Sequence, residues 1–214
     1  FDACYLPSGK IIFGSTASYQ SVPCSHGQAL VSLVSSLYLM NADGSGVRQL
    51  CYDQDHDLHA VVLPNGQVLF NRWDYTGINH IFLRELMAMN PDGTGQRAVY
   101  GSSSWFPNSL YFPRPLPGDS GRIICILSGY HGVHKMGQLV LVDPAKGWQE
   151  ADGLVQRISG RGDPINPLVR DVLVDPDWPK FFHPFPLSEK YFLVAAWPNA
   201  KAHWGIYLAD VFDN

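Results

Sequence analysis

The chain has 214 residues, of which 46% are hydrophobic and 16% charged, so it is long and apolar enough to bury a substantial core. Its formal net charge of −4 provides no basic field of the kind that holds nucleic acid, and no nucleic-acid partner is expected. The most apolar window, Ala29 to Met40, is interrupted by serines and is far shorter than the roughly 20 apolar residues of a membrane span, so no such span is expected.

Glycine and proline occur throughout the chain, which contains 20 glycines and 16 prolines. No segment has apolar residues at a helical period over a length sufficient to predict a helix. Strands joined by tight turns are therefore expected. In chain order, the alternating apolar patterns predict strand pairs at residues 3–13, 37–48, 59–70, 86–97, 122–127 with 138–147, and 184–194 with 205–210. This pattern favours an all-β fold.

One segment of the chain is repeated. Residues Leu37 to Arg48 recur as Leu86 to Arg97, with matches at Leu, Met, Asn, Asp, both glycines and Arg. Two weaker copies begin at Gln138 and Gly205. Each strong copy is an apolar strand that runs into an Asp-Gly turn, and the glycine supplies the positive φ that a tight hairpin requires.

Two successive hairpins make a four-stranded meander, and repeated units of this size in series are typical of propeller blades. The sequence therefore predicts an all-β propeller of four-stranded antiparallel blades, with about four blades present, at residues 1–52, 53–101, 102–160 and 177–214. A β-sandwich with coincidental turn similarity is the alternative fold. The fourth unit stops one strand short, so a partial propeller is expected, with a closed four-bladed ring as the alternative.

The repeats also carry a family resemblance. A Pro-x-Gly-Lys turn before one strand and Leu-Tyr-x-Met-Asn-x-Asp-Gly-Ser-Gly at the next resemble the TolB-like propeller repeat over nearly the whole chain. More narrowly, five segments look like the propeller of proteins related to the hydrazine synthase alpha subunit: residues 53–56, 107–109, 128–133, 178–184 and 204–207. The resemblance implies a six-bladed propeller, and a periplasmic or secreted protein with other domains or subunits as partners.

The cofactor expectations follow from the same resemblance. Hydrazine-synthase-like proteins carry c-type haem, but this chain has no C-x-x-C-H motif, so any haem is expected on domains outside it and no cofactor is covalently bound here. Cys4, Cys24, Cys51 and Cys125 show no metal-binding spacing. Buried free thiols are expected in preference to one or two disulfides.

The histidines gather at one end of the predicted blades. In a four-stranded meander, the long connections between the second and third strands and between blades lie on one face, and all eight histidines fall there or at adjoining strand ends. His59 and His183 occupy matching positions at the rim of the central channel. With His131, and more weakly with His134, they could converge on a divalent transition metal. Alternatively, each imidazole orders its own loop.

Other residues on this long-loop face are candidates for ligand contact. Asp55 and His56 belong to a compact acidic loop with Asp53 and Asp57, which either binds a cation or is simply solvated. The full set of ligand-face candidates is His56, Asp55, Arg72, Trp73, Tyr130, Trp178 and His203. The tryptophans could stack on a sugar or cap the packing between blades.

No catalytic motif is present, since the chain lacks G-x-S-x-G, H-E-x-x-H and nucleotide-binding loops, so enzymatic activity stays open. Three functions remain. The first is the propeller module of a larger extracytoplasmic protein, with its histidine-rich face near a metal or redox centre. The second is a non-catalytic scaffold that binds a protein or glycan. The third is a metal-dependent polysaccharide lyase, with Lys135, Arg72 or Arg114 as the base.

Overall fold

The computed structural model describes residues 1–23, 32–75, 82–102, 105–107, 109–118, 120–133, 135–160 and 162–213. Within these ranges the regular structure is strand, and none of it is α-helix. No helix long and apolar enough to cross a membrane occurs in this part of the chain. The expectation of an all-β fold built from antiparallel blades is confirmed.

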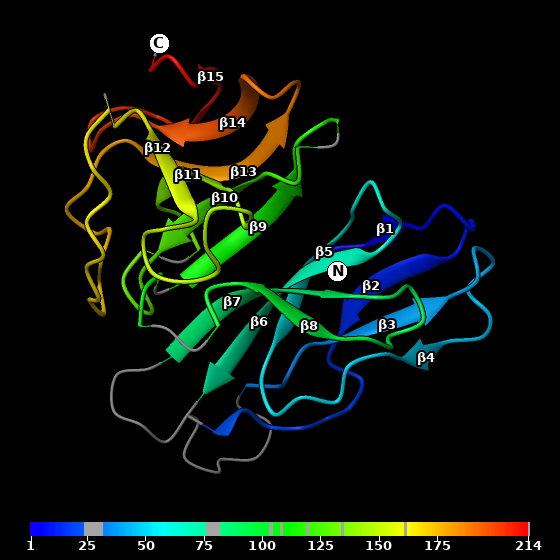
Figure 1. The fold of residues 1–214 in the computed structure, drawn as a ribbon. Coiled ribbons are helices and arrows are strands. Elements are labelled where there is room, and N and C mark those ends of the chain that lie inside the picture. The colour runs from blue at the N-terminus through cyan, green and yellow to red at the C-terminus, as the bar shows by residue number, and fades with distance from the viewer. Residues whose placement is uncertain are drawn as a thin grey trace.

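The strands pair with their sequence neighbours in four groups, which we call blades one to four (Figure 1). Blade one contains β1 (Cys4–Tyr5), β2 (Ile11–Ser15), β3 (Ser36–Met40) and β4 (Arg48–Gln49). Blade two contains β5 (Asp57–Val62), β6 (Val68–Tyr75), β7 (Phe82–Met89) and β8 (Arg97–Tyr100). Blade three contains β9 (Ser109–Pro115), β10 (Ile123–Ser128), β11 (Gln138–Val142) and β12 (Leu154–Ile158). Blade four contains β13 (Lys180–Pro186), β14 (Tyr191–Trp197) and β15 (Gly205–Asp210).

The repeated turn motif has the same structure in both strong copies. Asp43 accepts a hydrogen bond from the backbone N–H of Ser45 at 3.0 Å, and Asp92 accepts one from the backbone N–H of Thr94 at 3.0 Å. The glycine after each aspartate has a positive φ, 84° in the first copy and 88° in the second. Because these contacts are local, the motif specifies the turn between the third and fourth strands of each blade without help from the rest of the fold.

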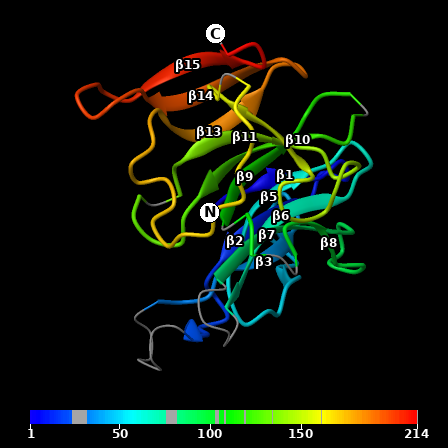
Figure 2. The same ribbon diagram turned by 60° about the vertical axis from the view of Figure 1, so that its left-hand side comes forward.

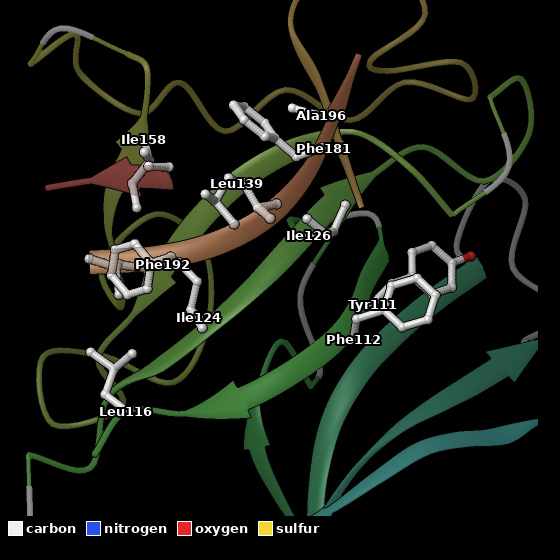
Figure 3. Close-up of a cluster of buried hydrophobic side chains, with 13 residues drawn as sticks. Tyr111, Phe112, Leu116, Ile124, Ile126, Leu139, Ile158, Phe181, Phe192 and Ala196 are labelled. Carbon is white, nitrogen blue, oxygen red and sulfur yellow. The ribbon is translucent and has the colours of Figure 1, made fainter. Parts of the chain in front are cut away.

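Apolar side chains fill the space between successive blades. In Figure 2 the β13–β15 sheet lies over blade three, which in turn lies over blade two. The cluster between blades three and four is drawn in Figure 3 and includes Phe181, Phe192, Leu139, Ile124 and Ile126. Similar clusters join blade one to blade two and blade two to blade three. This face-to-face packing of sheets buries most residues of the middle strands β3, β6, β10 and β11.

Two polar links tie blade two to blade three near the long-loop face. Arg84 in β7 pairs in parallel with Ser109 in β9, so the two blades share one continuous sheet at this point. Asn71, which is fully buried, donates from Nδ2 to the backbone oxygen of Leu110 at 2.5 Å and to that of Glu85 at 3.3 Å. These links set the separation of β6, β7 and β9, which line the site described next.

Candidate functional site

One residue in or just before the first strand of each blade has left-handed backbone geometry, and these residues occupy equivalent positions. Asp2, His59, Phe112 and His183 have φ values of 52°, 58°, 50° and 48°, and each stands four residues before a leucine. In β5, β9 and β13 the residue lies at a break in the pairing register. Non-glycine residues seldom adopt this conformation, and a bulge of this kind re-aims a side chain.

The four left-handed residues meet around a small cavity between the blades, which we call the channel. Asp2 Oδ2 lies 3.0 Å from His59 Nδ1, and the Phe112 ring lies against both imidazoles, at centroid distances of 4.0 Å from His59 and 4.1 Å from His183. With Arg114 they line a cavity of about 90 Å³. Burial lowers the pKa of both histidines, while the hydrogen bond with His59 lowers the pKa of Asp2. Both imidazoles are therefore held towards their neutral forms.

The channel residues do not form a preformed metal site. In the described part of the chain, the only group of three His, Cys, Asp or Glu residues with ligand atoms within 4.8 Å of one another is Cys51, Asp53 and Asp57. Among the described residues, His59 and His183 therefore have no third ligand within that distance, and Arg114 puts a positive charge beside them. The expected metal set of His59, His131 and His183 finds no support in this geometry.

His131 lies elsewhere. Its Nδ1 is 2.6 Å from Asp171 Oδ1, both side chains are exposed, and it is not among the residues that line the channel cavity. This pairing involves a segment between blades three and four for which the repeat pattern made no prediction. His203 is exposed in the connection between β14 and β15. His26, His80 and His134 lie outside the described residues.

The cluster of Cys51, Asp53 and Asp57 already has a cation. Arg72 places Nε 2.9 Å from Asp57 Oδ1 and Nη2 2.5 Å from Asp53 Oδ2. Burial raises the pKa of Asp57 to about 7 even though the guanidinium opposes the shift, and burial also raises the pKa of the Cys51 thiol. Arg72 is thus engaged in an ion-pair network that ties the loop before β5 to β6. Cys51, like Cys4 and Cys125, is a free thiol.

A larger cavity of about 350 Å³ opens on the long-loop face at the mouth of the channel. It is lined by Phe1, Thr16, Ser32, Leu33, Ser35, His56, Leu58, Trp73, Arg84, Tyr111 and Lys135. These residues come from the ends of β2, β5, β6, β7 and β9 and from the loops beside them, all of which lie at the same end of the blades. We call this space the mouth cavity.

Two cations face the mouth cavity, and no carboxylate is among the described residues that line it. The Arg84 guanidinium carbon lies 4.8 Å from the Trp73 ring centroid and 5.8 Å from that of Tyr111, and Nη1 donates to Ser109 Oγ at 3.2 Å. Neither Arg84 nor Lys135 has a carboxylate oxygen within 4.0 Å in the described ranges. Burial lowers the pKa of the Lys135 ammonium, which indicates a partly dehydrated charge.

Two neutral donors accompany the cations. His56 Nδ1 accepts the backbone N–H of Ser35 at 2.9 Å, so in the neutral ring the proton is on Nε2. Burial and then the charges of Arg84 and Lys135 lower the pKa of His56 to about 4, which keeps the ring neutral at physiological pH. Trp73 Nε1–H is buried and has no hydrogen-bond partner in the described structure.

Comparison with solved structures supports the architecture. Hydrazine synthase from Kuenenia stuttgartiensis superposes with a TM-score of 0.60 at 17% sequence identity, over 94% of this chain and 26% of that chain. The chain has a β-propeller fold. A protein assigned as a gluconolactonase also matches, with a TM-score of 0.47 and 14% identity, over 97% of this chain and 58% of that one. No protein-family model and no curated protein matches the sequence.

At 17% identity, the structural likeness to hydrazine synthase shows the fold alone and assigns no role to the residues of the site. Of the candidates predicted from sequence, the structure brings His56 and Trp73 together in the mouth cavity, with their ring centroids 5.3 Å apart. Tyr130 and Asp55 are buried nearby, where Asp55 Oδ2 accepts the backbone N–H of Tyr75 at 2.9 Å. Trp178 belongs to a separate cavity between blades three and four.

Sequence reasoning missed Arg84. A signal for it exists, because Arg84 and Glu85 interrupt an apolar strand in the second blade, where charged residues are costly to bury. Lys135 was considered only as the base of a lyase. The fold brings both cations to one site, because the strand that carries Arg84 and the loop that carries Lys135 converge on the mouth cavity.

Proposed function

We propose that this propeller is a non-catalytic binding module that holds an organic anion in the mouth cavity. The observation that carries the proposal is the imbalance between donors and acceptors. Arg84, Lys135 and the Nε2–H of His56 offer hydrogen-bond donors, and the unpartnered Nε1–H of Trp73 belongs to a residue of the cavity wall. No carboxylate of the described residues lines the cavity to accept them. A buried donor without a partner is costly, and an oxyanion would satisfy several of them at once.

The nearest acidic groups do not remove this imbalance. Asp2 lowers the electrostatic cost of Lys135 at longer range, but its carboxylate is paired with His59 at 3.0 Å. Asp55 uses one oxygen to accept the backbone N–H of Tyr75, and burial raises its pKa, which disfavours its charge. The positive potential of the cavity therefore survives. Burial is the main cause of the lowered pKa of His56, and the charges of Arg84 and Lys135 lower it further.

The walls of the cavity suggest the rest of the ligand. Leu33, Leu58, Trp73 and Tyr111 provide apolar and aromatic surface beside the cations. A volume of about 350 Å³ falls in the range of small-molecule sites, in which a few polar groups orient a ligand that is otherwise held by apolar contact. The proposed ligand is thus a small carboxylate or phosphate that carries a ring or chain of similar size to the cavity.

Isothermal titration calorimetry with benzoate, glucuronate, phenyl phosphate and uncharged glucose tests the proposal. We expect at least one anion to bind with an affinity that falls as salt is raised, and glucose not to bind at this site. Arg84→Gln and Lys135→Gln should each weaken anion binding roughly tenfold or more. Arg48→Gln is the matched control, because Arg48 is exposed at β4 and, among the described residues, donates only to the backbone oxygen of Asp92.

Two results would contradict the proposal. One is anion binding that is the same in the wild type, Arg84→Gln and Lys135→Gln proteins. The other is an equal loss in Arg48→Gln, which would indicate a general effect of net charge. Circular dichroism of each variant checks that the blades remain folded.

We also propose that the module belongs to a larger extracytoplasmic protein. The resemblance of the repeats to hydrazine synthase alpha subunit-related proteins supports this, as does a structural likeness that spans only 26% of the hydrazine synthase chain. The sequence of the gene on either side of this segment tests it, and further blades or haem-attachment motifs are the expected result.

A further inference from the structure

A second cavity, of about 300 Å³, lies between blades three and four. It is bordered by the end of β12, the start of β11 and the segment that leads into β13, which places it on the long-loop face. None of its lining residues borders the mouth cavity, so the two spaces are separate. Its most prominent side chain is Trp178, which remains 39% exposed.

The Trp178 indole is held in place by its neighbours. The Lys180 Nζ lies 4.5 Å from the centre of the ring and is itself anchored by the backbone oxygens of Val174 at 2.8 Å and Asp175 at 3.0 Å. Trp197 packs edge-on at 5.0 Å and 90°, and its own Nε1 donates to a backbone oxygen at 2.9 Å. An exposed aromatic ring that is already fixed loses little conformational entropy when a ligand stacks on it.

Planar polar groups line the same cavity as the exposed indole. Gln138 Nε2 donates to Asp177 Oδ2 at 2.6 Å, and both side chains line the cavity. Arg157 also lines it and pairs with Asp163 at 3.1 Å. Because the charges of Asp177 and Arg157 already have polar partners, this cavity lacks the excess of cations found in the mouth cavity. The remaining lone pairs and N–H groups are available to hydroxyl groups.

A second exposed indole extends the aromatic surface. Trp204 is 43% exposed and lies 5.8 Å from Trp197, at an interplanar angle of 37°. Trp197 therefore contacts two partly exposed indoles, Trp178 and Trp204. A surface with two accessible indoles suits a chain of ring-shaped units better than a single small molecule.

We propose that this cavity is a binding site for a neutral glycan, in which one pyranose ring stacks on Trp178 and hydrogen-bonds to Gln138, Asp177 and Arg157. A pyranose ring has an apolar C–H face that matches an indole and hydroxyl groups that match planar amide, carboxylate and guanidinium groups. The inference does not rest on the function of the mouth cavity, since the two sites share no lining residue.

The test uses neutral hexasaccharides built from glucose, mannose, xylose or N-acetylglucosamine, with binding followed by tryptophan fluorescence and calorimetry. At least one of them should bind the wild type, and Trp178→Ala should weaken that binding roughly tenfold or more. Gln138→Leu should also weaken it, whereas Trp178→Phe should retain part of it because a ring remains to stack. Arg84→Gln should leave it unchanged, which separates this site from the mouth cavity.

The matched control is Trp148→Ala. Trp148 is 76% exposed in the turn between β11 and β12, at the opposite face of the blade, so its loss should not affect glycan binding. The proposal is overturned if none of the hexasaccharides binds, if binding survives Trp178→Ala, or if Trp148→Ala weakens it equally. Thermal unfolding of the Trp178 variants is the check on folding, and Gln138→Leu provides the independent result should Trp178→Ala fail to fold.

Discussion

Asn71→Asp is a near-isosteric change that tests how blade two is tied to blade three. The Asn71 side chain is fully buried, and its Nδ2 donates to two backbone oxygens, those of Leu110 and Glu85. An ionised aspartate would place an oxygen against both carbonyls, and a protonated one could donate to only one of them. The new carboxyl group is therefore expected to be protonated in the folded protein, with a pKa well above its value in the unfolded chain.

The loss of unfolding free energy follows from this shift in the pKa of the new carboxyl group. The lost hydrogen bond costs about 1 kcal/mol at any pH. A group with a raised folded pKa stabilises the fold only while it is protonated, so its penalty appears as the pH rises above the unfolded pKa of about 4. If the folded pKa exceeds about 8, each pH unit between about 5 and 8 adds about 1.4 kcal/mol, or about 4 kcal/mol in all.

Urea unfolding followed by tryptophan fluorescence at both ends of this pH range measures the effect. Asn71→Leu is the control, because it removes the same donor without adding a titratable group, and its cost should not depend on pH. Equal destabilisation of Asn71→Asp at both pH values, or a pH dependence shared with Asn71→Leu, would refute the assigned role of Nδ2.

Three further predictions follow from burial and packing. Asp57→Asn should reduce the pH dependence of stability. The raised pKa of Asp57 makes the wild type lose stability as the pH rises from about 4 to about 7. Urea titrations of both proteins across this range should therefore show a flatter plot of unfolding free energy against pH for the variant. Phe192→Ala should lower the free energy of unfolding by about 3 to 5 kcal/mol, because the ring is fully buried between blades three and four. Ile206→Ala, at a site 81% exposed, should change it by less than about 0.5 kcal/mol. A similar cost for both variants in chemical denaturation would disprove the packing described. Gly137→Ala should lower the thermal unfolding midpoint measurably, since a Cβ there would lie 2.1 Å from a backbone oxygen of β10, and an unchanged midpoint would contradict that close approach.

The blade architecture was open to prediction because its signals are local. The Asp-Gly turns, the alternation of apolar residues and the repetition of the unit each depend on contacts within a few residues, such as the hydrogen bond from Ser45 to Asp43. The matching of His59 with His183 was also visible, since both precede a leucine by four residues. The same spacing holds for Asp2 and Phe112, and the structure shows all four as left-handed residues that line the channel cavity.

The candidate sites were only partly predictable. His56 and Trp73 were identified as ligand-face residues, but Arg84 was not, and its position beside Lys135 joins residues 51 positions apart in the sequence. His131 was predicted to be able to converge with His59 and His183 on a metal ion, with a role in ordering its own loop as the alternative. It pairs with Asp171 in a segment that has no counterpart in the repeat.

Sequence alone therefore determined the strands, their turns and their antiparallel order, because those properties follow from periodicity and from short-range hydrogen bonding. Only the tertiary structure decided which side chains share a cavity. Register breaks in β5, β9 and β13 turn individual side chains into the channel, and the packing between blades sets which loops converge on the mouth cavity. Both effects depend on contacts between distant segments. The four-residue spacing to a leucine marks the positions of the left-handed residues, but no local pattern in the sequence records which side chains meet there.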